Sequence, residues 1–387
     1  MPEKFETFTI NYPLFNREQL NIKNLKEREN KIIFDHDMIP PSRKPRQLSE
    51  AGISLVERTV EKIRIAKEKG SSVMLTFGAH TIKNCMAPTL IELMKNGWVT
   101  HLATNGAGII HDWEIAFQGK TSEDVRENVN RGQFGIWEET GFYINLAIIV
   151  GAFENLGYGE SIGKMITNEG LYIPEISYLY YTAQKCMISD PNKSAAAIDL
   201  AGTIKHFNLK QGFMYIPHPW KVYSVQAQAY KLSIPFTGHP MFGHDIIYTH
   251  PLNHGAAIGR TAQTDFLRFA ASVSNIDYGV YMSVGSAVMS PMIFEKALSM
   301  AQNLKIKEGK HIDNHYILIV DLAESDWDWQ NNGEPPIDNP AYYLRYCKTF
   351  NRMGGEMHYL TSDNRDFLLT LHRKMTSDEL QVIIHNS

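Results

Sequence analysis

The sequence is poor in cysteine, and the few it has are scattered. Three cysteines, Cys85, Cys186 and Cys347, occur among 387 residues, far apart and outside any Cys-x-x-Cys spacing. This pattern excludes a disulfide-based scaffold and a cysteine-rich zinc motif, so we expect reduced thiols that serve packing.

Basic excess and long apolar runs are also missing. The formal net charge is -4, which argues against a nucleic-acid partner. No run approaches about 18 uninterrupted apolar residues, and the amino terminus lacks the basic start and apolar core of a secretory signal. With 43% hydrophobic residues the chain can bury a full core. We therefore expect a soluble, cytoplasmic protein without a membrane partner.

The most informative stretch runs from residue 71 to residue 114. Residues 73–77 form an apolar run of strand length, and apolar positions at helical spacing follow between residues 82 and 94. A second apolar run, residues 98–103, ends at a glycine-containing turn before another helix from residue 109. The pattern predicts strand, turn and helix, twice in succession.

The two turns suggest a ligand. Where a parallel strand enters a helix through small residues, the backbone can approach a ligand closely, and the free N–H groups of the helix favour a pyrophosphate. Gly106-Ala107-Gly108 contains only the first two glycines of a Gly-x-Gly-x-x-Gly motif, with Asp112 further on. Dinucleotide binding and simple tight turns both remain open from this pattern.

Strands alternate with helices along the rest of the chain. Residues 1–48 have no helical or strand period, which indicates an extended arm that packs on the body or on a neighbouring subunit. Residues 49–387 are predicted to form one α/β domain, a parallel sheet with helices on both faces. The helices are expected at 49–69, 138–155, 190–204, 224–231, 264–274, 291–304, 340–352 and from 363, and the further strands at 212–216, 233–237, 277–284, 315–322 and 357–360.

Ligands of such sheets bind beyond the carboxyl ends of the strands. Small residues and carboxylates recur at these predicted ends: Gly78-Ala79-His80, Thr104 to Gly108 with Asp112, Gly238-His239 with His244-Asp245, Gly285-Ser286-Ala287, Asp321 to Asp326 with Asp328, and Ser362-Asp363.

From about residue 50 to residue 373 the chain resembles deoxyhypusine synthase. Ser224-Val225, Ala229, Lys231 and Ile234-Pro235 are similar to the family stretch Ser-Val-Tyr-Tyr-Trp-Ala-x-Lys-x-x-Ile-Pro. The turn from Thr104 to Gly108 stands where the family has Thr-Thr-Ala-Gly-Gly, and the turn that starts at Gly285 stands where it has three glycines.

The resemblance implies a Rossmann-like fold, NAD as cofactor and a homotetramer with active sites between subunits. It also implies a chemistry: a polyamine is oxidised by hydride transfer, and its aminoalkyl group passes through a lysine imine to an amine acceptor. Residue by residue, it implies cofactor binding by Gly78, Ala79, Thr104, Gly106, Ala107, Asp112, Ser362 and Asp363. It implies substrate binding by His244, Asp326, Trp327 and Asp328, and catalysis by Asp245 and Lys348.

Lys348 precedes Tyr359 by eleven residues, the spacing of the family's imine-forming lysine, but the Trp-Gly-Lys motif is absent. A nucleophilic lysine must lose its proton near neutrality, which requires burial or a nearby cation; Arg345 could supply that cation. Ser290 and Phe294 replace a family histidine and asparagine. These departures put spermidine itself in question as the donor.

Two other interpretations compete with the synthase-like one, and one further pattern has two readings. Four histidines (His239, His244, His250 and His254) lie close together in sequence and could hold a metal ion that activates water, as in a hydrolase. The chain could also bind a nucleotide without catalysis. Finally, Trp327 and Trp329 alternate with Asp326 and Asp328, which suits either a wall for an alkylammonium ligand or a packed surface loop.

Overall fold

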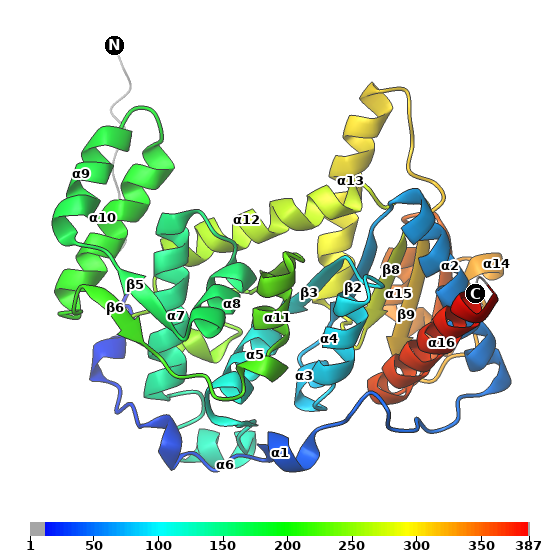
Figure 1. Cartoon of the computed structure of the whole chain (residues 1–387), viewed down its shortest axis with the longest axis horizontal. Coiled ribbons are helices and arrows are strands. Elements are labelled where there is room, and N and C mark those ends of the chain that lie inside the picture. The colour runs from blue at the N-terminus through cyan, green and yellow to red at the C-terminus, as the bar shows by residue number, and fades with distance from the viewer. Residues whose placement is uncertain (1–11, 386–387) are drawn as a thin grey trace.

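A parallel six-stranded sheet forms the centre of the protein (Figure 1), in a computed structural model that describes residues 12–385. The strands are β2 (Val73–Phe77), β3 (His101–Asn105), β7 (Phe236–His239), β8 (Val280–Val284), β9 (Tyr316–Asp321) and β10 (Glu356–Thr361). Each neighbouring pair runs parallel. The predicted α/β class is confirmed.

The order of the strands is β10-β9-β8-β2-β3-β7. The first strand of the sheet, β2, thus lies in the middle; the second and third follow on one side, and the fourth to sixth on the other. This is the doubly wound order in which dinucleotides bind, and its switch point lies between β2 and β8.

Alternating side chains of the sheet belong to two separate cores. Val73, Leu75 and Phe77 of β2 face one core, whereas Met74 faces the other, as the period of two in a strand requires. The first core includes residues of α2 (Glu50–Lys69), α4 (Ala87–Lys95), α5 (Gly106–Gln118), α7 (Glu138–Glu154), α8 (Tyr158–Asn168), α11 (Val225–Leu232) and α16 (Asn364–His385). The second includes α12 (Gly255–Val273), α13 (Met289–Lys307), α14 (Trp329–Asn332) and α15 (Arg345–Asn351). Helices therefore cover both faces, as predicted.

Local signals in the sequence explain several boundaries. Ser49 caps α2 by accepting a hydrogen bond from Gly52 N, and Gly70 ends that helix with a left-handed backbone (φ 67°). The single helix predicted across residues 82–94 is wrong, because Cys85 has φ 56° and divides it into α3 (His80–Lys83) and α4. Pro88 then stands in the first turn of α4, where its missing N–H costs nothing.

One predicted strand does not join the main sheet. β6 (Gly212–Tyr215) pairs antiparallel with β5 (Gly170–Ile173). Phe213 and Tyr215 are exposed, whereas β2 and β8 are buried along their whole length, so β6 lacks the burial of a central strand. With α9 (Ile176–Cys186) and α10 (Pro191–His206) this pair forms the lobe at the left of Figure 1. The expectation of one sheet is corrected to one main sheet and small additional pairs.

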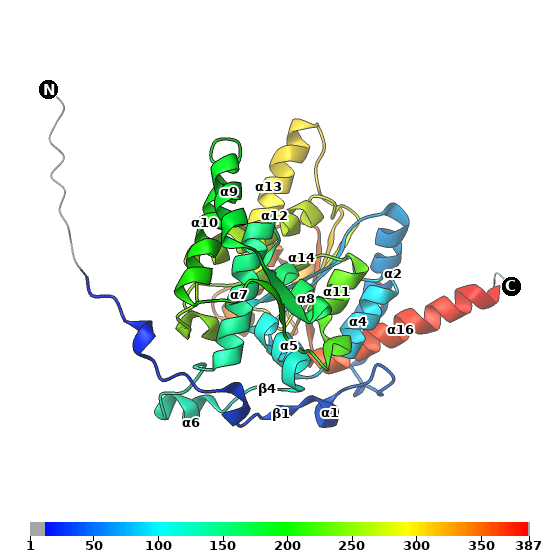
Figure 2. The same ribbon diagram turned by 60° about the vertical axis from the view of Figure 1, so that its left-hand side comes forward.

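The amino-terminal segment lies along the lower side of the body (Figure 2). Within it, β1 (Ile32–Ile33) pairs antiparallel with β4 (Lys120–Thr121) and leads into α1 (Phe34–Asp37). Arg28 donates to both carboxylate oxygens of Glu114 on α5, at 2.7 and 2.8 Å. Residues 1–11 of the predicted arm lie outside the described residues. The remaining short helix is α6 (Val125–Asn130), and 3-10 turns occupy Arg17–Gln19, Leu25–Glu27, Lys221–Tyr223, Ile246–Thr249 and Pro340–Tyr343.

Side chains bind outward-facing amides on both edge strands of the sheet. On β7, Gly238 N donates to Asp265 Oδ2 of α12 at 2.7 Å. On β10, Met357 N donates to Gln330 Oε1 of α14 at 2.8 Å. Separately, among the described residues we find no helix of the length and apolar character that a membrane span needs.

Candidate functional site

A pocket of about 300 Å³ lies beyond the carboxyl ends of β2 and β3. Its walls come from the turn after β2, the start of α5, the loop after β7 and the amino-terminal segment. The lining residues are Arg28, Ala79, His80, Lys83, Ala107, Ile110, His111, Glu114, Ser122, Glu123, Val125, Phe134, His244, Asp245 and Ile246. The predicted residues Ala79, Ala107, His244 and Asp245 thus meet in one pocket.

Asp245 is held over the first turn of α5. A β-carbon at Gly106 would collide with its carboxylate, so only glycine at that position admits Asp245. Burial raises the pKa of Asp245 to about 7. A carboxyl group with this pKa can give or take a proton at neutral pH.

Two tyrosines near Asp245 were missed in the sequence. The oxygen atoms Asp245 Oδ2, Tyr158 Oη and Tyr248 Oη are all buried, and none has a hydrogen-bond partner among the described residues. Burial and then the charge of Asp245 raise the pKa of both tyrosines. Buried polar atoms are normally satisfied, so three such oxygens without a partner around one carboxyl group are unusual. No spacing rule links residues 158, 245 and 248, and the fold alone brings them together.

Lys83 is the unpaired cation of the pocket. Its ammonium has no ion pair or hydrogen bond among the described residues, and burial, followed by the charge of Lys31, lowers its pKa. His80 and His111 line the same pocket; burial lowers the pKa of His80, and lowers that of His111 to about 4. Both imidazoles are therefore neutral at pH 7.

The floor of the pocket is an ion pair between the amino-terminal segment and α5. Burial opposes ionisation of Glu114, but Arg28 outweighs this and lowers the pKa of Glu114. Thr121 and Thr140 also donate to Glu114. Because both its oxygens are engaged, Glu114 stabilises the wall and leaves Asp245 as the available carboxyl group.

Asp112, predicted to bind the cofactor, does not line the pocket. It is 1% exposed, and it accepts hydrogen bonds from Ser224 Oγ, Val225 N, Gln226 N and Gln226 Nε2. These donors lie in the first turn of α11, so Asp112 attaches α11 to α5. The prediction is corrected from a ligand contact to a buried structural contact.

We expect Asp112→Asn to reduce the free energy of unfolding by about 1–3 kcal/mol, because the new amide hydrogens face buried donors that lose their acceptor. Cofactor affinity should stay unchanged. Urea denaturation measures the first quantity and calorimetric titration the second. Asp124→Asn is the matched control, since Asp124 caps α6 near the surface and asparagine caps as well as aspartate. Equal stability of the two variants would contradict this role.

The other predicted turn residues are engaged mainly by the protein. Thr104 is fully buried and donates to Phe77 O at 2.8 Å, and a β-carbon at Gly108 would collide with the Thr104 hydroxyl. A β-carbon at Gly78 would collide with Gly285 O. Gly78, Gly106 and Thr104 therefore pack closely against their neighbours at the strand ends, and their contact with a cofactor stays a prediction.

Gly285 is different, since nothing lies within 4 Å of where its β-carbon would be. It has φ 58°, is exposed, and precedes α13, whose residue Ser290 donates its N–H to Ser286 Oγ. The turn from Gly285 to Ala287 lies at the switch point beside Gly78. The backbone that is open to a ligand is therefore the turn after β8.

Ser362 and Asp363 follow β10, two strands from β8. Asp363 accepts two hydrogen bonds from the guanidinium of Arg365, at 2.9 and 2.7 Å, and forms an ion pair with Arg46. The hydrogen bonds and the charge of Arg365, followed by the charge of Arg46, lower the pKa of Asp363. Asp363 is therefore ionised, and it lies just after β10, an outer strand of the sheet. Its contact with a cofactor stays a prediction.

Lys348 does not line the pocket of Asp245. It belongs to α15, where its ammonium is 3.6 Å from Glu334 and 3.7 Å from the ring centre of Tyr342. α15 packs beside α13 and β10, on the side of the second core, whereas Asp245 lies against Gly106 at the start of α5. The structure therefore does not bring the two predicted catalytic residues into one pocket.

The predicted substrate residues after β9 do not form a wall. Asp328 caps α14 by accepting from Gln330 N and Asn331 N, Trp329 is 1% exposed, and Trp327 donates its indole N–H to Gly333 O at 2.9 Å. Asp326 is exposed. These contacts favour the interpretation as a packed surface loop.

The four clustered histidines have separate neighbours. His239 contacts Thr237, His250 contacts Glu138, and His254 lies 3.7 Å from Asp199, whereas His244 lines the pocket. Among the residues that the structure describes, no group of three metal-ligating side chains converges. The cluster in sequence is not a cluster in space.

Comparisons with known proteins give structural likeness only. No protein-family model matches the chain, and no curated protein matches its sequence. A protein described as LOR/SDH from Methanococcus maripaludis S2 is 11% identical, with 88% of this chain and 74% of that one covered and a TM-score of 0.43.

AgrE, in a ternary complex with ornithine and NAD+, is 14% identical with a TM-score of 0.42; 87% of this chain and 34% of AgrE are covered. ArgZ, an arginine dihydrolase from cyanobacteria, is 15% identical with a TM-score of 0.37, with 84% and 32% covered. This chain thus spans about a third of AgrE and ArgZ. With TM-scores below 0.5, none of these similarities bears on the activity or ligands of this chain.

Proposed function

We propose that this chain is an NAD-dependent enzyme that oxidises a small amine in the pocket of Asp245 and Lys83. The observation that carries the proposal is the position of that pocket, at the carboxyl ends of β2 and β3, beside the switch point of a doubly wound sheet. Ligands of such sheets bind at this place.

The residues at the switch point fit a dinucleotide. Gly285 leaves its backbone open to a phosphate, and the first turn of α13 follows at once with N–H groups that favour an anion. Ser362 and Asp363 lie two strands away at the same edge and would contact the other end of the cofactor. NAD, when bound, supplies the acceptor for a hydride.

The pocket provides the remaining chemistry. The carboxylate of Asp245 attracts the ammonium group of a substrate and accepts a proton from it, because an amine must be neutral before it loses a hydride. Lys83 attracts an anionic group at the other side. This combination favours a small amine that also carries a carboxylate.

The finer proposal, in the manner of deoxyhypusine synthase, is transfer of an aminoalkyl group from a polyamine through a lysine imine. This mechanism needs a lysine amine of the protein inside the pocket. Lys83 is that amine within one chain, and Lys348 would have to come from a second copy in the expected homotetramer. Burial and a neighbouring cation, the conditions for a nucleophilic lysine, both apply to Lys83.

We expect NAD to bind to the cofactor-stripped protein, and hydride transfer to follow when a suitable amine is added. Calorimetry with NAD alone, and then with ornithine or spermidine present, measures binding; absorbance of the reduced cofactor measures turnover. Preference for ornithine would support the pocket chemistry, and preference for spermidine the finer proposal. Binding without turnover with any amine would indicate a non-catalytic nucleotide-binding protein, and absence of NAD binding would overturn the proposal.

A further inference from the structure

One face of α5 forms a wall of the pocket of Asp245. Four residues at the spacing of a single helix face line the pocket: Ala107, Ile110, His111 and Glu114. Asp245 lies against Gly106 at the start of this helix. His111 follows Gly106 by five residues, about 7.5 Å along the helix axis. A carboxyl group and an imidazole thus lie one after the other along the same wall.

Hydrogen bonds fix the tautomer of His111. Thr121 donates its single hydroxyl hydrogen to Glu114 Oε2 at 2.6 Å, and His111 Nδ1 lies 2.7 Å from the same hydroxyl oxygen. Since that hydrogen is already engaged, Nδ1 must be the donor, and Nε2 of the neutral ring is then an acceptor only. The opposite direction would need a protonated Glu114, which the two hydrogen bonds from Arg28 disfavour.

Nε2 of His111 is accessible from the pocket. The His111 side chain is 18% exposed, whereas Thr121 and Glu114, which lie on its Nδ1 side, are buried. Nε2 lies on the other side of the ring. It has no hydrogen-bond partner in the described part of the chain, yet it does not belong to the buried unpartnered atoms there. A ligand can therefore reach this acceptor.

The surroundings of His111 favour an uncharged donor at Nε2. A carboxylate has no hydrogen to donate, and a cation would meet the charge of Lys83, which lines the same pocket. Burial, followed among the cations by Lys83 and Arg28, lowers the pKa of His111 to about 4. The ring is thus neutral at pH 7, and the lone pair of Nε2 is free. Water is an uncharged donor that fits this position.

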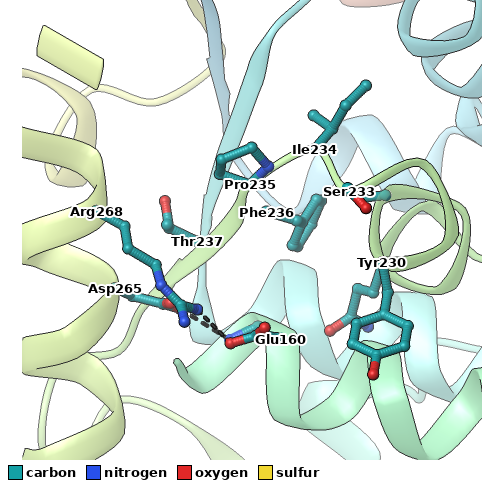
Figure 3. A pocket seen from close by; sticks show the side chains of 12 residues that line it. Glu160, Tyr230, Ser233, Ile234, Pro235, Phe236, Thr237, Asp265 and Arg268 are labelled. Atoms are coloured by element: carbon teal, nitrogen blue, oxygen red, sulfur yellow. Dashed lines mark hydrogen bonds and ion pairs between the residues drawn. The ribbon is translucent and has the colours of Figure 1, made fainter. Parts of the chain in front are cut away.

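A second pocket, of about 440 Å³ at the outer edge of β7, lacks such an acceptor (Figure 3). Figure 3 shows Arg268 of α12 and Glu160 of α8 directed toward each other, and the two form an ion pair. No described residue of this lining is a histidine. Imidazole, carboxyl and unpaired ammonium groups meet in the pocket of Asp245 instead.

We propose that His111 holds and deprotonates the water that hydrolyses an imine in the pocket of Asp245, which makes the protein a deaminating enzyme. The proposal rests on the proposed function, in which loss of a hydride converts the neutral amine into an iminium ion. It gives the two groups on the wall of α5 separate tasks. Asp245 prepares the amine for oxidation, and His111 acts on the product of that oxidation.

Hydrolysis forms a C–O bond and breaks the C–N bond of the imine. The water oxygen attacks the iminium carbon, and the second electron pair of the C=N bond moves to nitrogen. Nε2 of His111 takes one proton from the water and passes it to that nitrogen. The C–N bond then breaks with its electrons on nitrogen, and the remaining hydroxyl proton goes to the released ammonia. The products are a carbonyl compound and ammonium.

The test uses the full chain with NAD and the amine identified by the NAD experiment. His111→Asn keeps an N–H near the position of Nδ1, which can still donate to Thr121, but it has no atom at the position of Nε2. In a single turnover we expect reduced cofactor to form at the wild-type rate and ammonium to be released more slowly by about 10²-fold or more. Absorbance and an ammonium assay measure the two steps. His311→Asn is the matched control, because His311 is exposed.

Nitrogen-15 NMR of the histidine rings measures the tautomer without cofactor or substrate. We expect Nδ1 of His111 to carry the proton at pH 7 and Nε2 to carry none, with the signals assigned by their loss in His111→Asn. A proton on Nε2, or ammonium release from His111→Asn as fast as from the wild type, would overturn this role of His111 alone. Reduced cofactor without ammonium from the wild type would overturn it in favour of group transfer. If the wild type forms no reduced cofactor, the proposed function fails, and this role of His111 with it.

Discussion

Gly285→Asn should weaken NAD binding by about tenfold or more, which is about 1.4 kcal/mol. Gly285 is the position at the switch point where the backbone is open, with no atom within 4 Å of a β-carbon. An asparagine side chain would occupy the space that the proposal assigns to the cofactor phosphates. Asparagine tolerates the left-handed backbone better than other residues with a side chain, so the fold should survive. Calorimetric titration of NAD measures the effect.

Gly309→Asn is the matched control. Gly309 has φ 69° and the same open surroundings, but it lies after the far end of α13. The two variants should have the same melting temperature and differ only in affinity. Equal NAD affinity in both would contradict a cofactor position at the turn after β8.

Asp245→Asn should lower kcat/KM by about 10²- to 10⁴-fold, the usual contribution of a general acid or base. The amide keeps the shape of the side chain but cannot accept the proton of the substrate ammonium. Steady-state rates with the amine identified by the NAD experiment measure the loss. Glu308→Gln, an exposed carboxylate paired with Lys310, serves as the control, and an equally active Asp245→Asn would exclude Asp245 from the chemistry.

The pH dependence gives an independent measure of Asp245. Only the carboxylate accepts a proton, so wild-type kcat/KM should rise with pH through about 7, and this rise should be missing in Asp245→Asn.

The free energy of unfolding should change with pH in the opposite direction. The folded state holds the proton more tightly than the unfolded chain, so this group lowers the free energy of unfolding as pH rises from 3.8 to about 7. Asp245→Asn, which resembles the protonated form, should therefore be no less stable at pH 8.

Much of the fold can be explained by local sequence. The helix α2 could be predicted from Ser49, its apolar period and Gly70, and the strands β2 and β8 from buried apolar runs, because each signal lies within one element. The positive φ of Cys85 and the separate pairing of β6 with β5 could not, since both depend on contacts made only in the folded chain.

The candidate site also combines features that the sequence predicts with features that only the fold creates. The edge of the sheet where ligands bind, and the presence of His244 and Asp245 at it, could be predicted from the residues that come directly after each strand. Asp112 follows a turn of cofactor-binding type and lies in α5, yet its donors come from residues more than a hundred positions away. Lys83 and Tyr158 carry no motif, and only the path of the loop after β7 brings Asp245 to them.

The two bound edges of the sheet restrict how copies of this chain can assemble. A neighbouring strand would need the outward amides of Gly238 and Met357, which Asp265 and Gln330 already occupy. Exposed edges otherwise recruit strands from other molecules. A sheet continuous across subunits is therefore disfavoured at these positions. At these two edges an oligomer should therefore form through helices and loops, and detachment of α12 or α14 would expose a strand edge that can recruit other chains.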